Sequence, residues 1–196
     1  AAYSIEGRSS KDFKKTIKFV ENNQESTHLL LTKFTDACYL YLRKQVKAGA
    51  DVIQIFDSWA NLLDPKNLRS FSLNYTKSLI SALKQDPLTA NTPIILFSRE
   101  PKCDEQTLIN TSADCISLYW NMVDFDINIA RDKVAIQGNL DPKVLLESKD
   151  LIKEEAYKIL NKYEGYPGYI FNLGHGITPN INPDNVKFLT DVVREY

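Results

Sequence analysis

The stretch Val52-Ile53-Gln54-Ile55-Phe56 decides the fold class, because it is a short apolar run that stops abruptly at Asp57-Ser58-Trp59. An apolar run of this length, bounded by turn residues, indicates a buried strand. Apolar residues at helical spacing precede it over residues 27–46 and follow it over residues 65–83, where Pro65 can open the helix. A buried strand between two amphipathic helices is the building unit of a parallel α/β sheet.

Strand and helix patterns alternate outward from this stretch along the whole chain. Gly49 lies where a helix commonly ends, and Ser9-Ser10 is expected to cap a helix that begins near Phe13. We therefore predict the α/β class, with parallel strands joined by right-handed crossovers in a single domain. The expected strands are residues 52–56, 94–97, 115–120, 134–137 and 169–172, and the expected helices are residues 13–20, 27–46, 65–83, 151–163 and the segment after Asn182-Pro183.

The composition is that of an ordinary globular protein. The chain has 196 residues, of which 43% are hydrophobic and 25% charged, and its net charge is -1. This balance gives no electrostatic argument for a nucleic acid or an anionic membrane as partner. No apolar run approaches the roughly 20 residues that span a bilayer, and the first residues do not form a signal peptide. The three cysteines lack CxxC spacing, which indicates reduced thiols in a cytoplasmic protein.

The apolar pattern also predicts which side chains are buried. Cys38 and Cys115 lie within apolar patterns and are expected to be small core residues. The helix over residues 27–46 is expected to bury one face, which consists of Leu30, Phe34, Ala37, Tyr41 and Val46.

Polar residues follow each of the expected strands. Because parallel strands end at one edge of a sheet or barrel, and α/β proteins place their sites at that edge, we expect these residues to bind a polar ligand. The five strand ends are Asp57-Ser58-Trp59, Ser98-Arg99-Glu100, Tyr119-Trp120-Asn121, Gln137-Gly138-Asn139-Leu140-Asp141-Pro142 and Asn172-Leu173-Gly174-His175-Gly176.

Two charged or titratable side chains stand out at these strand ends. His175 lies between glycines, which let a backbone approach a ligand closely and adopt unusual dihedral angles; alternatively, the glycines only form a tight turn that His175 caps. Arg99 follows a buried strand, and its planar guanidinium suits a carboxylate or phosphate, although an ion pair with Glu100 or Asp57 is an equal alternative. Asp57 can instead act as a helix or loop cap. The second histidine, His28, is expected to be an exposed helix residue.

Familiar cofactor and hydrolase motifs are absent from the sequence. There is no GxGxxG, GxxxxGK[ST], HExxH or GxSxG motif, which removes support for nucleotide, zincin and serine-hydrolase sites. Histidines and cysteines do not have metal-ligand spacing. The sequence therefore predicts neither a cofactor nor a metal.

Several motifs, taken in order, resemble the uroporphyrinogen decarboxylase family over essentially the whole chain. They are Tyr3-Ser4-Ile5-Glu6-Gly7 with Ser9-Ser10-Lys11, Ala48-Gly49-Ala50, Ile55-Phe56-Asp57-Ser58-Trp59, Gln137-Gly138-Asn139-Leu140-Asp141-Pro142 and Phe171-Asn172-Leu173-Gly174-His175-Gly176. The resemblance implies a distorted (β/α)8 TIM barrel, a cytoplasmic homodimer, and no cofactor. It also implies decarboxylation of the four acetate side chains of uroporphyrinogen III to give coproporphyrinogen III in haem and porphyrin biosynthesis.

The resemblance assigns substrate binding to particular residues of this chain. Tyr3, Ser58 and His175 match the family positions that hydrogen-bond substrate carboxylates, and Arg99 stands where relatives often have lysine. By the same comparison, residues 1–196 correspond to strands four to eight of the barrel. The aspartate that binds the pyrrole N–H groups and the arginines that clamp the substrate would precede them. We therefore expect a C-terminal fragment that is inactive or poorly soluble alone.

The sequence departs from the family pattern in three places and leaves two alternatives open. The departures are Arg8, Arg99-Glu100-Pro101-Lys102 and Tyr119, the last where relatives commonly have aspartate. One alternative is a degenerate, non-catalytic copy that binds a porphyrinogen or a partner subunit. The other is a cobalamin or coenzyme M methyltransferase, whose zinc site would need His-x-Cys where this chain has Ser98-Arg99-Glu100 and a cysteine where it has His175.

Overall fold

The computed structural model describes residues 1–8, 10 and 12–196. The expected cap at Ser9-Ser10 and the motif Ser9-Ser10-Lys11 therefore lie partly outside the described residues. Ser10 itself accepts a hydrogen bond from the N–H of Phe13 at 3.2 Å. The described residues form two compact units, Ala1–Asp114 (unit 1) and Cys115–Tyr196 (unit 2), and each is considered separately.

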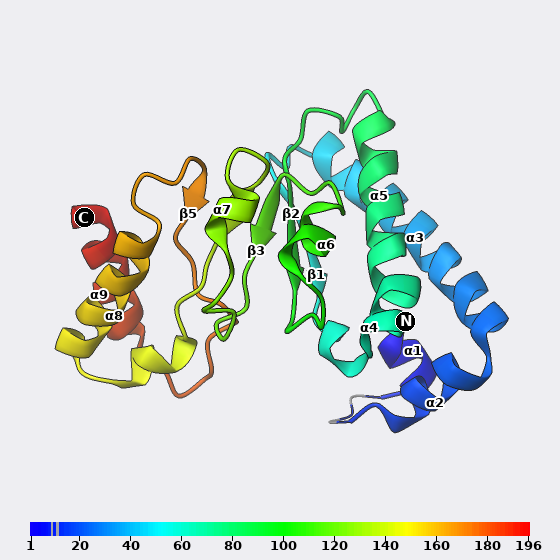
Figure 1. The fold of residues 1–196 in the computed structure, drawn as a ribbon, viewed down its shortest axis with the longest axis horizontal. Coiled ribbons are helices and arrows are strands. Elements are labelled where there is room, and N and C mark those ends of the chain that lie inside the picture. Colours follow the sequence, from blue (N-terminus) through cyan, green and yellow to red (C-terminus); the bar gives the residue numbers. More distant parts are fainter. Residues whose placement is uncertain (9, 11) are drawn as a thin grey trace. The chain divides into compact units, whose positions relative to one another are not determined.

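Unit 1 combines parallel strands with long helices (Figure 1). β1 and β2 pair in parallel, from Ile53 opposite Ile94 to Asp57 opposite Ser98. The helices α3 and α5 pack against each other. The elements in chain order are α1 (Ala2–Glu6), α2 (Lys14–Asn22), α3 (Gln24–Lys47), β1 (Ile53–Asp57), η1 (Ala60–Leu62), α4 (Pro65–Leu68), η2 (Arg69–Leu73), α5 (Asn74–Gln85), β2 (Ile94–Ser98) and α6 (Glu105–Ile109).

The helical segment after Pro65 follows directly from its sequence. The Asp64 side chain caps its first turn by accepting the N–H of Asn67, and Pro65 occupies the first helical position, where its missing N–H costs nothing. The predicted apolar face is confirmed over α4, η2 and α5. Leu68, Phe71, Leu79 and Leu83 are buried, and β2 is buried along its entire length.

The burial predicted for α3 is wrong. Phe34 is 36% exposed and Tyr41 is 64% exposed. Among the described residues of α3, Thr27 alone is buried. Cys38 is exposed as well, whereas Cys115 is buried as predicted. The reason is that α3 packs on α5 along one side, while Leu30, Phe34 and Cys38 line an open cavity.

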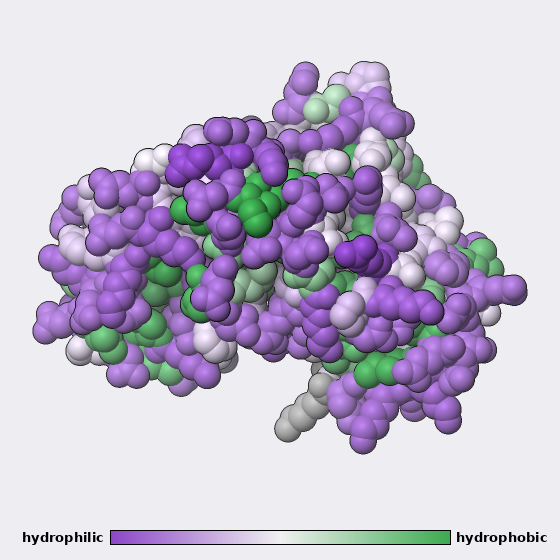
Figure 2. All heavy atoms as spheres, viewed as in Figure 1, coloured by the Kyte–Doolittle hydropathy of each residue, from purple (hydrophilic) through white to green (hydrophobic). Residues whose placement is uncertain are grey.

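The strand β1 is also less buried than its sequence suggests. Ile53 is 3% exposed, but Phe56 is 65% exposed. A continuous apolar run is typical of a strand covered on both faces, and β1 is not covered at Phe56. Figure 2 shows other places where hydrophobic residues reach the surface between hydrophilic ones.

Unit 2 repeats the parallel arrangement on a smaller scale. β3 pairs with β4 and β4 with β5, all parallel, and Leu140 bridges to Leu173 just beyond the strands. The helices α8 and α9 pack together over a core that includes Leu145, Ile152 and Leu189. The elements in chain order are β3 (Cys115–Ser117), α7 (Ile127–Ala130), β4 (Ala135–Gln137), η3 (Pro142–Leu146), α8 (Lys149–Lys162), β5 (Tyr169–Ile170) and α9 (Pro183–Glu195).

The α/β class with parallel strands is thus confirmed, although the strands of unit 2 are shorter than predicted. Within the described ranges, no helix is both long and apolar enough to cross a membrane.

Candidate functional site

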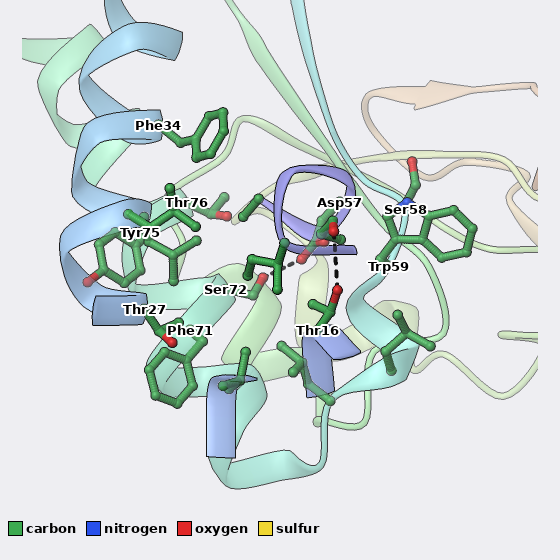
Figure 3. Close-up of a pocket in the computed structure, with 18 of the residues that line it drawn as sticks. Thr16, Thr27, Phe34, Asp57, Ser58, Trp59, Phe71, Ser72, Tyr75 and Thr76 are labelled. Carbon is green, nitrogen blue, oxygen red and sulfur yellow. Dashed lines mark hydrogen bonds between the residues drawn. The ribbon is translucent and has the colours of Figure 1, made fainter. Parts of the chain in front are cut away.

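In unit 1, Trp59 brings Tyr3, Ser58 and Arg99 together at the end of β1. The Tyr3 ring lies edge-on to Trp59 with centroids 5.9 Å apart, and the Arg99 guanidinium carbon lies 5.9 Å from the Trp59 ring centroid. Ser58 is exposed and directly precedes Trp59 in the turn (Figure 3). Two of the four predicted substrate-binding residues, Tyr3 and Arg99, therefore contact one indole ring, and Ser58 directly precedes it in the chain.

The parallel pairing of β1 and β2 explains this convergence. The N–H of Arg99 donates to the carbonyl of Asp57 at 3.0 Å, which extends the ladder one step past β2. Ser58 and Arg99 therefore leave adjacent strands at the same edge. A guanidinium over an indole face is attracted by the ring quadrupole, which restrains its orientation. The alternative role of Arg99, an ion pair with Glu100 or Asp57, stays a prediction.

The short helix α1 holds Tyr3 against this cluster. The hydroxyl of Thr16 donates to the carbonyl of Ala2 and to the carboxylate of Glu6, both at 3.1 Å, and the N–H of Thr16 donates to the same carboxylate. Phe13 is buried, and its ring centroid lies 5.6 Å from that of Tyr3 and 4.4 Å from that of Trp59. The sequence showed no signal for α1 or for this use of Thr16.

A cavity of about 440 Å³ opens beside the cluster, between α1, α2, α3, β1 and α5. Its walls are mostly apolar, and Asp57, Ser58 and Trp59 lie on one side of it (Figure 3). Tyr3 also lines the cavity. Binding sites for small molecules commonly have this character, with an apolar wall and a few convergent polar groups.

The carboxylate of Asp57 lies beside the turn that carries Ser58 and Trp59. It accepts a hydrogen bond from the Ser72 hydroxyl. Burial is the main cause that raises the pKa of Asp57 above its ordinary value, and the Ser72 hydroxyl and the nearby N–H of Trp59 oppose that shift. The alternative role of Asp57 as a helix or loop cap stays a prediction, and the part played by Ser72 was missed.

In unit 2, His175 is exposed on the loop that follows β5. Its ring lies edge-on to buried Tyr119, with centroids 5.7 Å apart and planes at 84°, and its Nδ1 is 3.3 Å from the carbonyl of Gly176. Unit 2 contains neither Tyr3, Ser58 nor Arg99, so His175 forms a separate part of the predicted site.

The glycines around His175 act differently from the prediction. Gly174 and Gly176 do not have a positive φ, so unusual dihedral angles are not their role. A Cβ on Gly174 would overlap the backbone of Trp120, whereas a Cβ on Gly176 would meet open space. Gly174 thus makes its close approach to the backbone of Trp120. The N–H of Gly174 also donates to the carbonyl of Leu140 at 2.8 Å.

Asn139 and Lys143 are further residues at this edge whose roles were not predicted. Asn139 is 2% exposed. Its amide Nδ2 donates to the carbonyl of Tyr119 at 3.2 Å, and the carbonyls of Trp120 and Met122 lie 3.5 and 3.4 Å from the same nitrogen. Among the residues that the structure describes, its Oδ1 has no hydrogen-bond partner although it is buried. The ammonium of Lys143 lies 5.7 Å from the Trp120 ring centroid.

Metal ligands do not cluster in the described part of the chain, since no group of three or more His, Cys, Asp or Glu side chains there could hold an ion. The donor groups at both strand edges are instead hydroxyls, an imidazole, amides and cations. Such groups suit the binding of carboxylates.

Comparison with known proteins identifies one family. A family model described as uroporphyrinogen decarboxylase (URO-D) matches residues 1–196. The uroporphyrinogen decarboxylase of Vesicomyosocius okutanii is 40% identical over 198 residues, which cover 100% of this chain and 56% of that protein. The uroporphyrinogen decarboxylase of Legionella pneumophila (strain Lens) is 39% identical over 199 residues, which cover 100% of this chain and 55% of that protein. The chain thus spans about half the length of the curated relatives it matches.

A solved structure resembles the fold. A methyltransferase from Methanosarcina mazei superposes with a TM-score of 0.74 and 23% sequence identity, covering 93% of this chain and 53% of that one. At this identity the likeness concerns the fold alone.

Proposed function

Because the chain belongs to the uroporphyrinogen decarboxylase family, we propose that it carries the C-terminal strands of a TIM-barrel enzyme that decarboxylates uroporphyrinogen III. The reaction removes the carboxylates of the four acetate side chains and yields coproporphyrinogen III in haem biosynthesis. Residues 1–196 would form the C-terminal portion of the single barrel domain and would act within a cytoplasmic homodimer. The free cysteines fit a reducing compartment.

The chemistry of the substrate explains why carboxylate-binding groups are needed. Protonation of a pyrrole ring makes that ring an electron sink. The bond between the acetate methylene and its carboxyl group then breaks, the electron pair passes to the ring, and carbon dioxide leaves. A proton then adds to the methylene carbon that lost the carboxyl group, and the ring releases the proton that it first accepted. No metal or pyridoxal is required, but the octa-anionic macrocycle must be held in a fixed orientation.

The observation that carries the proposal is the cluster of Tyr3, Ser58 and Arg99 around Trp59. The hydroxyls of Tyr3 and Ser58 can each donate to a carboxylate oxygen, and the guanidinium of Arg99 can bind a carboxylate through two parallel N–H groups. The exposed imidazole of His175 would supply a further donor. We assign these residues to substrate positioning and assign the pyrrole-binding aspartate and the clamping arginines to none of residues 1–196.

A chimera tests the proposal, because this chain spans about half of its relatives. It joins the N-terminal part of the Legionella pneumophila relative to residues 1–196. We expect the chimera to convert uroporphyrinogen III to coproporphyrinogen III, measured by chromatography of the oxidised porphyrins, and residues 1–196 alone to be inactive. A folded chimera that binds uroporphyrin without turnover would contradict the decarboxylase and favour the non-catalytic copy.

A further inference from the structure

Asp57 occupies a position where three segments of unit 1 meet. It is the last residue of β1, it lines the 440 Å³ cavity, and its Cα pairs with that of Ser98 on β2. η2 approaches from the other side and contributes Ser72 (Figure 3).

The hydrogen bonds of Asp57 link these segments. Its carboxylate accepts a hydrogen bond from the Ser72 hydroxyl and lies near the Trp59 N–H, which favours its charged form, and its backbone carbonyl accepts from the Arg99 N–H at 3.0 Å. The carboxylate therefore fixes the direction in which the chain turns after β1, while the carbonyl fixes where Arg99 leaves β2. Ser58 directly follows Asp57 in the chain, next to the two residues, Trp59 and Arg99, whose positions Asp57 sets.

The position is an unfavourable one for a carboxylate that only serves stability. Burial beside an apolar cavity raises the pKa of Asp57, which means that the fold disfavours the charged form. Other titratable groups that line the same cavity are Tyr3, Cys38, Tyr75 and the amino group of Ala1. A carboxylate kept at a net electrostatic cost is better explained by the geometry that it imposes.

We propose that Asp57 is a positioning residue, whose carboxylate holds the Ser58–Trp59 turn so that the Ser58 hydroxyl, the Trp59 ring and the Arg99 guanidinium face one ligand carboxylate. The identity of that ligand group rests on the proposed function, but the effect on the turn does not. Asp57 itself does not touch the reacting atoms.

Trp59 reports on the turn directly. In the Trp120→Phe background, Trp59 is the sole tryptophan, since the chain has two. Asp57→Ala removes both carboxylate acceptors, and Asp57→Glu moves them by one methylene. Both variants should shift the Trp59 emission to longer wavelength and increase its quenching by acrylamide in the ligand-free chain. Asp57→Asn keeps an acceptor for the Trp59 N–H and should retain the parent spectrum.

The chimera measures the consequence for the substrate. We expect Asp57→Ala and Asp57→Glu to raise KM by about tenfold with a smaller change in kcat, because carboxylate binding is weakened before chemistry begins. Asp57→Asn should restore most of the loss. If Asp57→Ala does not fold, Asp57→Glu decides the question alone.

Each outcome separates the two proposals. Unchanged Trp59 emission and quenching in folded Asp57→Glu would overturn the positioning role, whatever the chimera does. A chimera that lacks activity with an intact Asp57 would overturn the proposed function, while the Trp59 spectra would still decide whether Asp57 orders the turn.

Discussion

The two strand edges hold their functional side chains by different means. In unit 1, side chains hold side chains, since Tyr3 and Arg99 each contact Trp59 and the Asp57 carboxylate accepts a hydrogen bond from Ser72 beside them. In unit 2, the backbone does this work: Gly174 packs on the backbone of Trp120, and the Asn139 amide donates to backbone carbonyls. His175 contributes little to its own placement.

This difference teaches which perturbations each edge should resist. Backbone packing leaves no room for an added methyl group but carries no charge, so unit 2 should be sensitive to side-chain volume and insensitive to pH. The half-buried carboxylate of Asp57 adds a charge that titrates, so unit 1 should respond to pH as well as to side-chain shape. Four substitutions test this contrast, in decreasing order of their expected effect on stability.

The largest loss is expected for Gly174→Ala. The added Cβ would overlap the backbone of Trp120, which cannot move aside as a flexible side chain would. We expect a loss of about 3 kcal/mol in the free energy of unfolding, measured by urea denaturation. Gly176→Ala is the matched control, since its Cβ meets open space and its φ is not positive, and it should change stability by less than about 0.5 kcal/mol. Equal effects of the two variants would show that the loop is not packed as described.

A smaller loss is expected for Asn139→Leu. This change keeps the number of side-chain heavy atoms but removes the buried amide that donates to the carbonyl of Tyr119, so buried acceptors lose their donor. We expect destabilisation of about 2 kcal/mol by urea denaturation, with no dependence on pH between about 4 and 8. Asn139→Asp should be at least as harmful, because it places an acceptor against the same carbonyls. A neutral Asn139→Leu would argue that the amide is not what holds Tyr119 and Trp120.

In unit 1, the charge of Asp57 should make stability depend on pH, and the variant Asp57→Asn tests this. Because burial raises the pKa of Asp57, the native state binds its proton more tightly than the unfolded chain does. Wild-type stability therefore falls as pH rises from the ordinary carboxyl pKa through the raised one, and the uncharged Asp57→Asn variant escapes that fall. Relative to wild type, the variant should gain stability across this window and keep the gain at neutral pH. Melting curves at a series of pH values measure it; a constant difference at all pH values would contradict the buried charge.

The fold was predictable where local patterns suffice, and the contacts that hold the site were not. Apolar runs located all the strands that the described residues show, and Pro65 located a helix start. The helix α1 was missed because five residues are too few for helical periodicity to register. The exposure of Cys38 was missed because the amphipathic pattern of α3 cannot say which face another element covers.

The same limit applies within the site. Motif positions brought out Tyr3, Ser58, Arg99 and His175, and contacts between residues far apart in the sequence explain what holds them. Ser72 lies 15 residues from Asp57, and Trp120 lies far from the glycine that packs on it. Such pairings depend on the tertiary fold and leave no local signal. The sequence therefore pointed to Gly174 without indicating that it packs on the backbone of Trp120.

The smallest effect on stability is expected for His175→Ala, and this variant connects the two edges to function. His175 is exposed and contacts Tyr119 only edge-on, so its removal should change the free energy of unfolding by less than about 0.5 kcal/mol. In the chimera, however, the loss of an imidazole donor should lower kcat/KM for uroporphyrinogen III by about tenfold. Chromatographic assays and melting curves on the same preparations measure both quantities. A large fall in melting temperature with unchanged turnover would make His175 a structural residue, and the backbone packing around Gly174 would then serve stability rather than the site.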